Sequence, residues 1–206
     1  MKLTKLFVAS ISFHFLCAFV TPSSQGAVYQ SSVAVTPTTI FPGANYEIRA
    51  WTEPNFGGDG AYLGLFADTQ RILRPVNYTV GIGHVWYRTL DGQMIDPAFV
   101  VSNSPFASSI TGDLSGQIQM TLGGSFLLGF WLDANTDHTP DAGDRFGWAR
   151  LRYTAANGLT LVDNAIESTG TGIIAGTTTV APEPGSESLL LGGLLAILAP
   201  RRRRAQ

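Results

Sequence analysis

Hydrophobic and polar residues alternate along most of the middle of this 206-residue chain. The stretch 115–122 is the clearest case, since every second residue toward its end is apolar: Ile118, Met120 and Leu122. The stretch 125–132 continues the pattern with an apolar series on one face: Phe126, Leu128, Phe130 and Leu132. A period of two places successive side chains on opposite faces of an extended chain, so the pattern predicts β-strands.

Further strands are expected wherever the same alternation or an aromatic and β-branched run recurs. These stretches are 46–50, 62–67, 78–87, 99–102, 146–153 and 160–166. Clusters of Gly, Pro, Asn and Asp separate them, as is typical of turns. The pair Gly123-Gly124 predicts a tight hairpin between 115–122 and 125–132, because two glycines supply the positive φ angles of a primed turn.

No window shows three turns of helical periodicity with caps. About eight to ten strands in about 150 residues are typical of a single β-sandwich. We therefore expect an all-β, jelly-roll-like sandwich over residues 28–179, flanked by residues 1–27 and 180–206.

Composition and charge narrow the function classes. With 45% hydrophobic and 14% charged residues, the chain is too apolar to be disordered, and one cysteine excludes a disulfide scaffold. Between Val28 and Ala181 there are seven Arg, no Lys and thirteen Asp or Glu, a net charge of −6. A nucleic-acid partner is not expected, because such binding depends on neutralising phosphates.

The first 27 residues have the features of a secretory signal peptide. Lys2 and Lys5 precede an apolar run over 6–20, and small residues follow. Signal peptidase prefers small residues just before the cut, and cleavage after Gly26 meets this preference better than cleavage after Ala27. We expect the Sec translocon and signal peptidase as partners. The alternative is an uncleaved anchor, but the run is shorter than the ~20 residues that span a bilayer.

The last residues combine three features in order. Pro182-Glu183-Pro184 is followed by an apolar run over 189–199 and then by four basic residues: Arg201, Arg202, Arg203 and Arg204. An arginine at mid-membrane costs about 2.5–3.5 kcal/mol, so this cluster should stay on the cytoplasmic side. The N-terminal lysines should stay there too, which leaves the body outside.

This order of features resembles the PEP-CTERM sorting signal of Gram-negative bacteria that make extracellular polysaccharide. The resemblance implies that an exosortase, a membrane transpeptidase-like enzyme, recognises Pro182, Glu183 and Pro184 and removes the tail. It also implies that Arg201 to Arg204 act as a retention signal. The stretch 145–151, which contains Phe146-Gly147-Trp148, also resembles a strand common near the end of these proteins, and we expect Phe146 and Trp148 to share a face with Arg150.

The tail is expected to be a transient anchor. As a helix, residues 185–200 would span ~24 Å, which is less than the ~30 Å hydrocarbon core of a bilayer. An ordinary tail anchor is the alternative.

Sequence motifs of catalysis are not found, and we expect no enzymatic activity. Only His84 and His138 lie outside the signal segment, which is too few for a three-histidine zinc site. We interpret His84, which follows Gly81-Ile82-Gly83, as a packing position inside a strand. A glycosidase carboxylate pair, hinted at by Glu47, Glu53 and Asp59, depends on a separation that spacing does not give.

One acidic stretch, 133–144, has the oxygen spacing of an EF-hand-type calcium loop. The candidate ligands occupy loop positions 1, 3, 5, 9 and 12: Asp133, Asn135, Asp137, Asp141 and Asp144. Against calcium, His138 stands where Gly makes the sharp turn, and Asp144 replaces the bidentate Glu. The alternative is a solvated hairpin loop, since Asp and Asn favour turns.

These observations favour an exported, non-enzymatic protein of the cell surface or the biofilm matrix, linked to exopolysaccharide. The alternative is a carbohydrate-binding module in which an exposed tryptophan stacks on sugar rings, and Trp131, beside the acidic loop, is its candidate. A secreted hydrolase ranks last.

Overall fold

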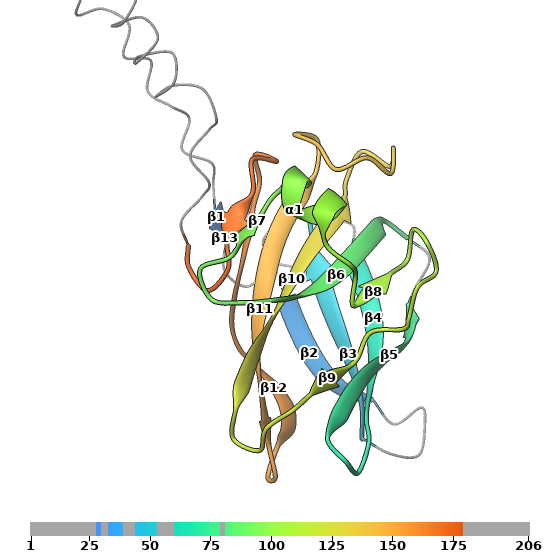
Figure 1. The fold of residues 1–206 in the computed structure, drawn as a ribbon, viewed down its shortest axis with the longest axis vertical. Helices are drawn as coiled ribbons and strands as arrows, with labels where there is room; N and C mark the ends of the chain where they lie inside the picture. The colour runs from blue at the N-terminus through green and yellow to red at the C-terminus, as the bar shows by residue number, and fades with distance from the viewer. Residues whose placement is uncertain (1–27, 30–32, 39–43, 53–59, 79–80, 179–206) are drawn as a thin grey trace, which may run out of the picture.

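The computed structural model describes residues 28–29, 33–38, 44–52, 60–78 and 81–178. They form two stacked antiparallel sheets with a small covering layer (Figure 1), so the all-β sandwich is confirmed. The expected signal peptide, 1–27, and the sorting segment, 180–206, lie outside the described residues.

The larger sheet has six strands in the order β1-β12-β11-β10-β6-β8. Their bounds are β1 Val28–Tyr29, β12 Gly158–Glu167, β11 Arg145–Thr154, β10 Ser125–Asp133, β6 Gly83–Thr89 and β8 Ala107–Ser108. Neighbouring strands are antiparallel throughout.

The smaller sheet has five strands in the order β2-β3-β4-β5-β9. Their bounds are β2 Val33–Thr38, β3 Ala44–Trp51, β4 Gly60–Ala67, β5 Ile72–Tyr78 and β9 Ile118–Gln119. A separate two-stranded ribbon pairs β7, Met94–Ile95, with β13, Ile173–Ile174.

The main core lies between the two sheets. The predicted apolar face of β10 points into it, and Leu128, Phe130 and Leu132 are all 0% exposed. From the five-stranded sheet, Ile48 and Leu63 meet them, also fully buried. Burial of apolar surface on this scale is the dominant force that holds two sheets together.

A second core covers the opposite face of the six-stranded sheet. Helix α1, Pro97–Ser102, contributes Phe99 and Val100, and the ribbon contributes Ile95 and Ile173. Figure 1 shows α1, β7 and β13 gathered over one end of this sheet. Strand β10 is therefore buried on both faces.

Helix α1 corrects the expectation of a strand over 99–102. The side chain of Asp96 caps the helix by accepting a hydrogen bond from the Phe99 N–H at 2.7 Å, and Pro97 occupies the first turn. An acidic N-cap followed by proline is a helix-start signal that outweighs the β-branched residues after it. Within the described ranges, no helix is long and apolar enough to cross a membrane.

The hairpin expected at Gly123-Gly124 is wrong. Strand β9 pairs with β5 in the smaller sheet, whereas β10 pairs with β6 and β11 in the larger one. The two glycines carry the chain from one sheet to the other, and the Gly123 N–H donates to the carbonyl oxygen of Tyr153 at 2.8 Å. Of the strand expected over 115–122, only Ile118–Gln119 is a strand, and the alternation contained no information about which strands pair.

The strand expected over 78–87 is also divided between the sheets. Its first residue, Tyr78, ends β5 in the smaller sheet, and residues from Gly83 onward form β6 in the larger sheet.

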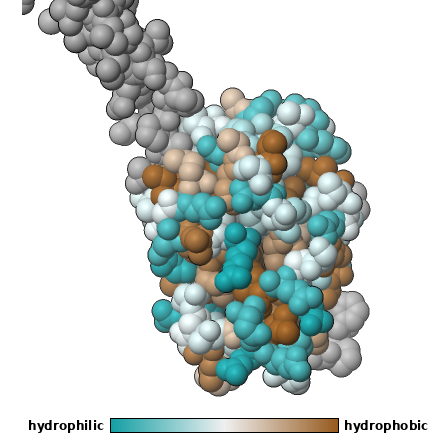
Figure 2. All heavy atoms as spheres, viewed as in Figure 1, coloured by the Kyte–Doolittle hydropathy of each residue, from teal (hydrophilic) through white to brown (hydrophobic). Residues whose placement is uncertain are grey.

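Outside the cores, hydrophilic residues are spread over the face shown in Figure 2, with smaller hydrophobic areas between them. Leu90 and Val101 are the most exposed large apolar residues in the described part of the chain, at 70% and 78%.

Candidate functional site

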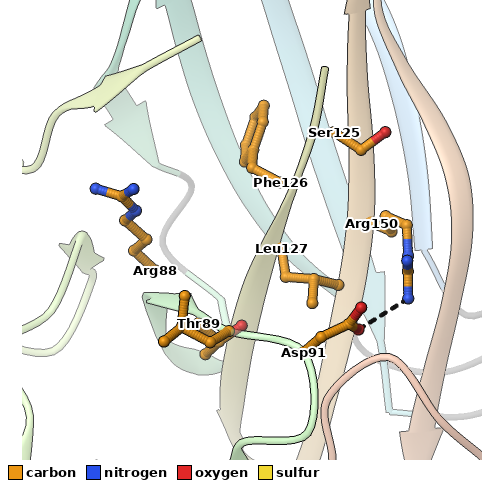
Figure 3. Close-up of a pocket in the computed structure, with 8 residues that line it drawn as sticks. Arg88, Thr89, Asp91, Ser125, Phe126, Leu127 and Arg150 are labelled. Atoms are coloured by element: carbon orange, nitrogen blue, oxygen red, sulfur yellow. Dashed lines mark hydrogen bonds and ion pairs between the residues drawn. The ribbon is translucent and has the colours of Figure 1, made fainter. Parts of the chain in front are cut away.

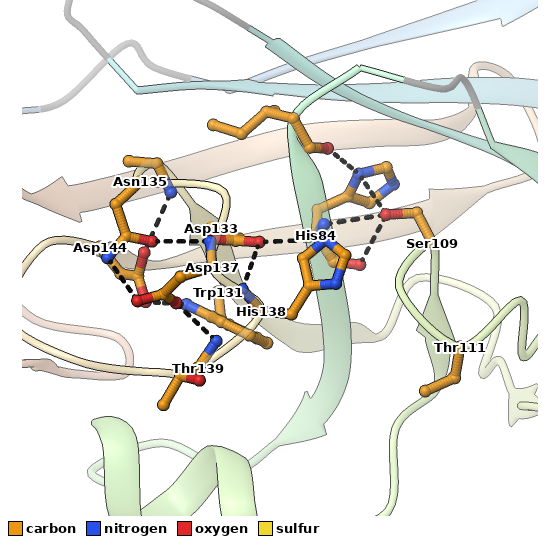
Figure 4. Close-up of polar contacts among 12 residues, drawn as sticks. His84, Ser109, Thr111, Trp131, Asp133, Asn135, Asp137, His138, Thr139 and Asp144 are labelled. Carbon is orange, nitrogen blue, oxygen red and sulfur yellow. Dashed lines mark hydrogen bonds and ion pairs between the residues drawn. The ribbon is translucent and has the colours of Figure 1, made fainter.

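The acidic loop connects β10 to β11 at one end of the six-stranded sheet (Figure 4). Asp133 is the last residue of β10, and Asp144 directly precedes β11. Both side chains are 0% exposed. The loop is therefore anchored on two buried carboxylates, a costly arrangement unless each is well hydrogen-bonded.

Hydrogen bonds from the loop itself supply most of that compensation. Asp133 accepts backbone N–H groups of Asp137 and His138, both at 3.1 Å. The imidazole Nε2 of His138 lies 3.7 Å from Asp133 Oδ2, an ion pair when the ring is protonated. His138 has a φ of 61°, so it makes the left-handed turn that glycine makes in an EF-hand.

Asp144 has a different set of donors. It accepts the indole N–H of Trp131 at 2.7 Å, the Ala134 N–H at 3.0 Å and the Asp141 N–H at 3.1 Å. Burial raises the pKa of Asp144 above its usual value, and the negative charge of Asp133 raises it further, although the hydrogen bonds oppose both effects.

The remaining candidate ligands stay near the surface. Asn135 donates its amide N–H to Asp137 at 3.1 Å and to Asp141 at 3.3 Å, while its Oδ1 accepts the Asp137 N–H at 3.2 Å. The structure thus brings the five predicted ligands into one loop. Yet among the described residues no group of three or more His, Cys, Asp or Glu side chains is placed to hold a metal ion.

The sugar-stacking role expected of Trp131 is wrong. Its side chain is 3% exposed, packs in the second core and donates to Asp144. The sequence placed it on the face of β10 opposite the main core, which is correct. That face is covered by the layer of α1, β7 and β13, which the alternation of a single strand cannot reveal.

The other three tryptophans are also buried. Trp51, Trp86 and Trp148 are 8%, 0% and 3% exposed. The expected arrangement on β11 is confirmed, since Phe146 and Trp148 both lie in the second core and the Arg150 guanidinium stands 5.9 Å from the centre of the Trp148 indole.

His84 is buried in the sheet beneath the acidic loop, as the packing interpretation predicts. It is 0% exposed, and its Nδ1 lies 3.1 Å from the carbonyl oxygen of Ile82 and 3.1 Å from Oγ of Ser109 (Figure 4). Burial lowers its pKa below the usual value, because a charged imidazole loses its hydration there. A Cβ at Gly83 would lie 2.9 Å from Asp133 Oδ2, so this glycine makes room for the buried carboxylate.

The contact between His84 and Ser109 could not be found from the sequence, because 25 positions separate the two residues. It does not form a catalytic triad in the described structure. The hydroxyl contacts Nδ1, and Nε2 has no hydrogen-bond partner among the described residues. A serine nucleophile needs a histidine that a third group orients.

A second site, a pocket of about 230 Å³, opens at the far end of β10 (Figure 3). Ser125, Phe126 and Leu127 of β10 line it, together with Arg88 and Thr89 at the end of β6. The remaining lining residues are Leu90, Asp91 and Arg150, and Arg150 donates to Asp91 at 3.0 Å. No short motif marks this pocket, since its residues come from three separate segments.

Compared with protein-family models, with curated proteins and with solved structures, the chain shows no significant match.

Proposed function

We propose that this chain is an exported protein that an exosortase processes, and that its body serves a structural or adhesive role at the cell surface or in an exopolysaccharide matrix. The order of Pro182-Glu183-Pro184, the apolar run 189–199 and Arg201 to Arg204 carries the proposal. The N-terminal signal agrees with it, since both basic ends belong on the cytoplasmic side.

The course of the described chain supports a body held from one side. Val28, at its start, pairs with Glu167 of β12 and packs against the second core. Near its end, the carbonyl oxygen of Thr177 accepts the indole N–H of Trp148 at 2.8 Å. Both ends of the body therefore contact the second core, and the five-stranded sheet lies on the opposite side of the molecule.

The interactions of the acidic loop and of His84 support a structural role for the body. The acidic loop hydrogen-bonds its own backbone, and His84 is sealed in the interior. These contacts stabilise the sandwich, and they leave little freedom for proton transfer to a substrate.

Intact masses of the cell-associated and the secreted protein test the processing step. The secreted form should lack Arg201 to Arg204, and Glu183→Ala should accumulate as the uncut form at the membrane. Glu187→Ala is the matched control, because it removes a glutamate from the same tail but outside the tripeptide. A mature wild-type protein that still carries the arginines would refute the proposal.

We also propose that residues 133–144 bind calcium. Two fully buried carboxylates, Asp133 and Asp144, support this, because buried negative charge favours a cation nearby. The exposed Asp137 would have to turn from the Thr139 N–H, to which it is bonded at 2.7 Å, toward the ion.

Thermal unfolding with and without calcium tests this second proposal. Calcium at millimolar concentration should raise the melting temperature, since a ligand that binds only the folded state stabilises it. The rise should disappear in Asp137→Asn and persist with Asp113→Asn, an aspartate outside the loop. An unchanged melting temperature of the wild type would rule calcium out.

A further inference from the structure

The arginines of the body are unevenly placed. Of its seven, two line the pocket at the far end of β10: Arg88 on β6 and Arg150 on β11, the strands on either side of β10. A third, Arg152 on β11, bonds to Ser125 of the lining. The body as a whole has a net charge of −6, so a local group of positive charges stands out against it.

The pairing of these arginines determines the charge that the pocket presents. Arg150 forms ion pairs with Asp91 and Asp163, both at 3.0 Å, so its charge is compensated. The Arg88 guanidinium forms no ion pair or hydrogen bond with the described residues, although its backbone pairs with β10. Arg152 is exposed and donates to the Ser125 hydroxyl at 3.2 Å, with no carboxylate partner in the described structure. Three arginines against two aspartates leave a net charge of plus one.

Between its charged residues, the pocket is lined by apolar side chains. Figure 3 shows Arg88 and Arg150 on opposite sides of Phe126 and Leu127. These two apolar side chains point to opposite faces of β10: Phe126 packs against the main core, and Leu127 is buried in the second core. Polar groups surround them: the Asp91 carboxylate, the Ser125 hydroxyl and Thr89, whose buried Oγ1 has no hydrogen-bond partner among the described residues.

We infer that this pocket binds one sugar unit of an acidic, carboxylate-bearing polysaccharide. A pyranose ring has an apolar C–H face, which would lie on the half-buried Phe126, on the same face of the sheet as Arg88, and hydroxyls, which would reach Asp91 and Ser125. Its carboxylate would meet Arg88 or Arg152, because guanidinium groups bind carboxylates through paired hydrogen bonds. The inference rests on the proposed matrix function and names the partner of the body.

Titration with polygalacturonate oligomers tests the inference. The full chain would be used with Arg201, Arg202, Arg203 and Arg204 each replaced by serine, so that the tail does not bind polyanions itself. Methyl-esterified oligomers keep the rings but remove the charge, and single-stranded DNA supplies charge without sugar carboxylates.

Binding of polygalacturonate is expected, and it should weaken as salt is raised. The double variant Arg88→Gln, Arg152→Gln should raise the Kd at least tenfold. Arg74→Gln should leave the Kd unchanged, because Arg74 lies on the other sheet, paired with Asp68. Amide NMR shifts should move at 88–91 and 125–127.

Several results would overturn the inference. These are no binding of polygalacturonate, equal binding of the ester or of DNA, an equal loss in Arg74→Gln, or shifts confined to other regions. Phe126→Asn, which changes a half-buried apolar side chain of the lining and leaves the arginines in place, covers the case in which the double variant does not fold. It should also weaken binding. A protein that is processed normally but does not bind uronates would refute only the inference.

Discussion

At the scale of single residues, His84 makes the stability of the protein depend on pH. Its pKa is lowered by burial, so as the pH falls the unfolded chain takes up a proton before the folded one does. The stability is therefore full above the ordinary histidine pKa of about 6.5 and declines below it.

We predict that the free energy of unfolding falls by up to about 1.4 kcal/mol per pH unit below pH 6.5 through this residue. Urea unfolding between pH 7.5 and 5.0 would measure it. His84→Gln should flatten this part of the profile, whereas His138→Gln, on the exposed loop, should retain it. Equal slopes in the wild type and His84→Gln would contradict the assignment.

The bond from Trp131 to Asp144 is a second feature at this scale. Trp131→Phe leaves the buried carboxylate with one donor fewer, which costs about 1–3 kcal/mol beyond the loss of ring volume. Trp86→Phe is the matched control, because the indole N–H of Trp86 has no partner among the described residues. Chemical denaturation should find the first variant less stable than the second.

At the scale of elements, close packing of β7 on β10 depends on Gly129. A Cβ there would lie 2.6 Å from Cγ2 of Thr89 and 2.7 Å from Cδ1 of Ile95. Glycine thus lets the ribbon of β7 and β13 approach the sheet.

We predict that Gly129→Ala destabilises the fold by about 1–3 kcal/mol through overpacking. Gly81→Ala is the control, since its new Cβ would approach no atom closer than 3.6 Å. Thermal unfolding should separate the two. Equal melting temperatures of the two variants would show that the ribbon of β7 and β13 can move to accept the extra methyl group without a loss of stability.

Most strands could be predicted from the sequence, because their alternation reflects a local geometry. The strand over 146–153, for example, lies within β11. Their pairing could not be predicted. Gly123-Gly124 is compatible both with a hairpin and with a crossing between sheets, and only the packing of Ile118 and Met120 in the main core decides.

The candidate sites also divide into those that a local sequence pattern marks and those that depend on contacts between distant segments. Loop residues 133–144 could be found because their spacing is local in the sequence. Trp131 is buried by a covering layer that begins 37 positions earlier, at Met94 of β7. The pocket around Arg88 and Arg150 brings distant segments together, so no local pattern marks it.

At the scale of the whole molecule, the described body holds its own C-terminal end. Ile173 and Ala175 are 0% exposed and belong to the second core, and Thr177 binds Trp148. The residues after 178 are expected to add nothing to its stability.

A chain of residues 28–178 should therefore unfold at the same temperature as a chain of residues 28–206. A chain that ends at Gly172 should melt several degrees lower, since it exposes Ile95 and Trp148. Calorimetry of the three chains would check this. A lower melting temperature for the 28–178 chain would show that the tail takes part in the fold.

Both ends of the described body contact the second core, so a tail that continues from residue 178 would hold the body on that side. In the anchored form proposed above, the covering layer would face the membrane and the outer face of β3, β4 and β5 would face away from it. On that outer face Arg49 stands 4.8 Å from the centre of the Tyr62 ring. On spheroplasts that carry the anchored form, an antibody against that outer face should bind, whereas an antibody against α1 should bind only after the protein is released.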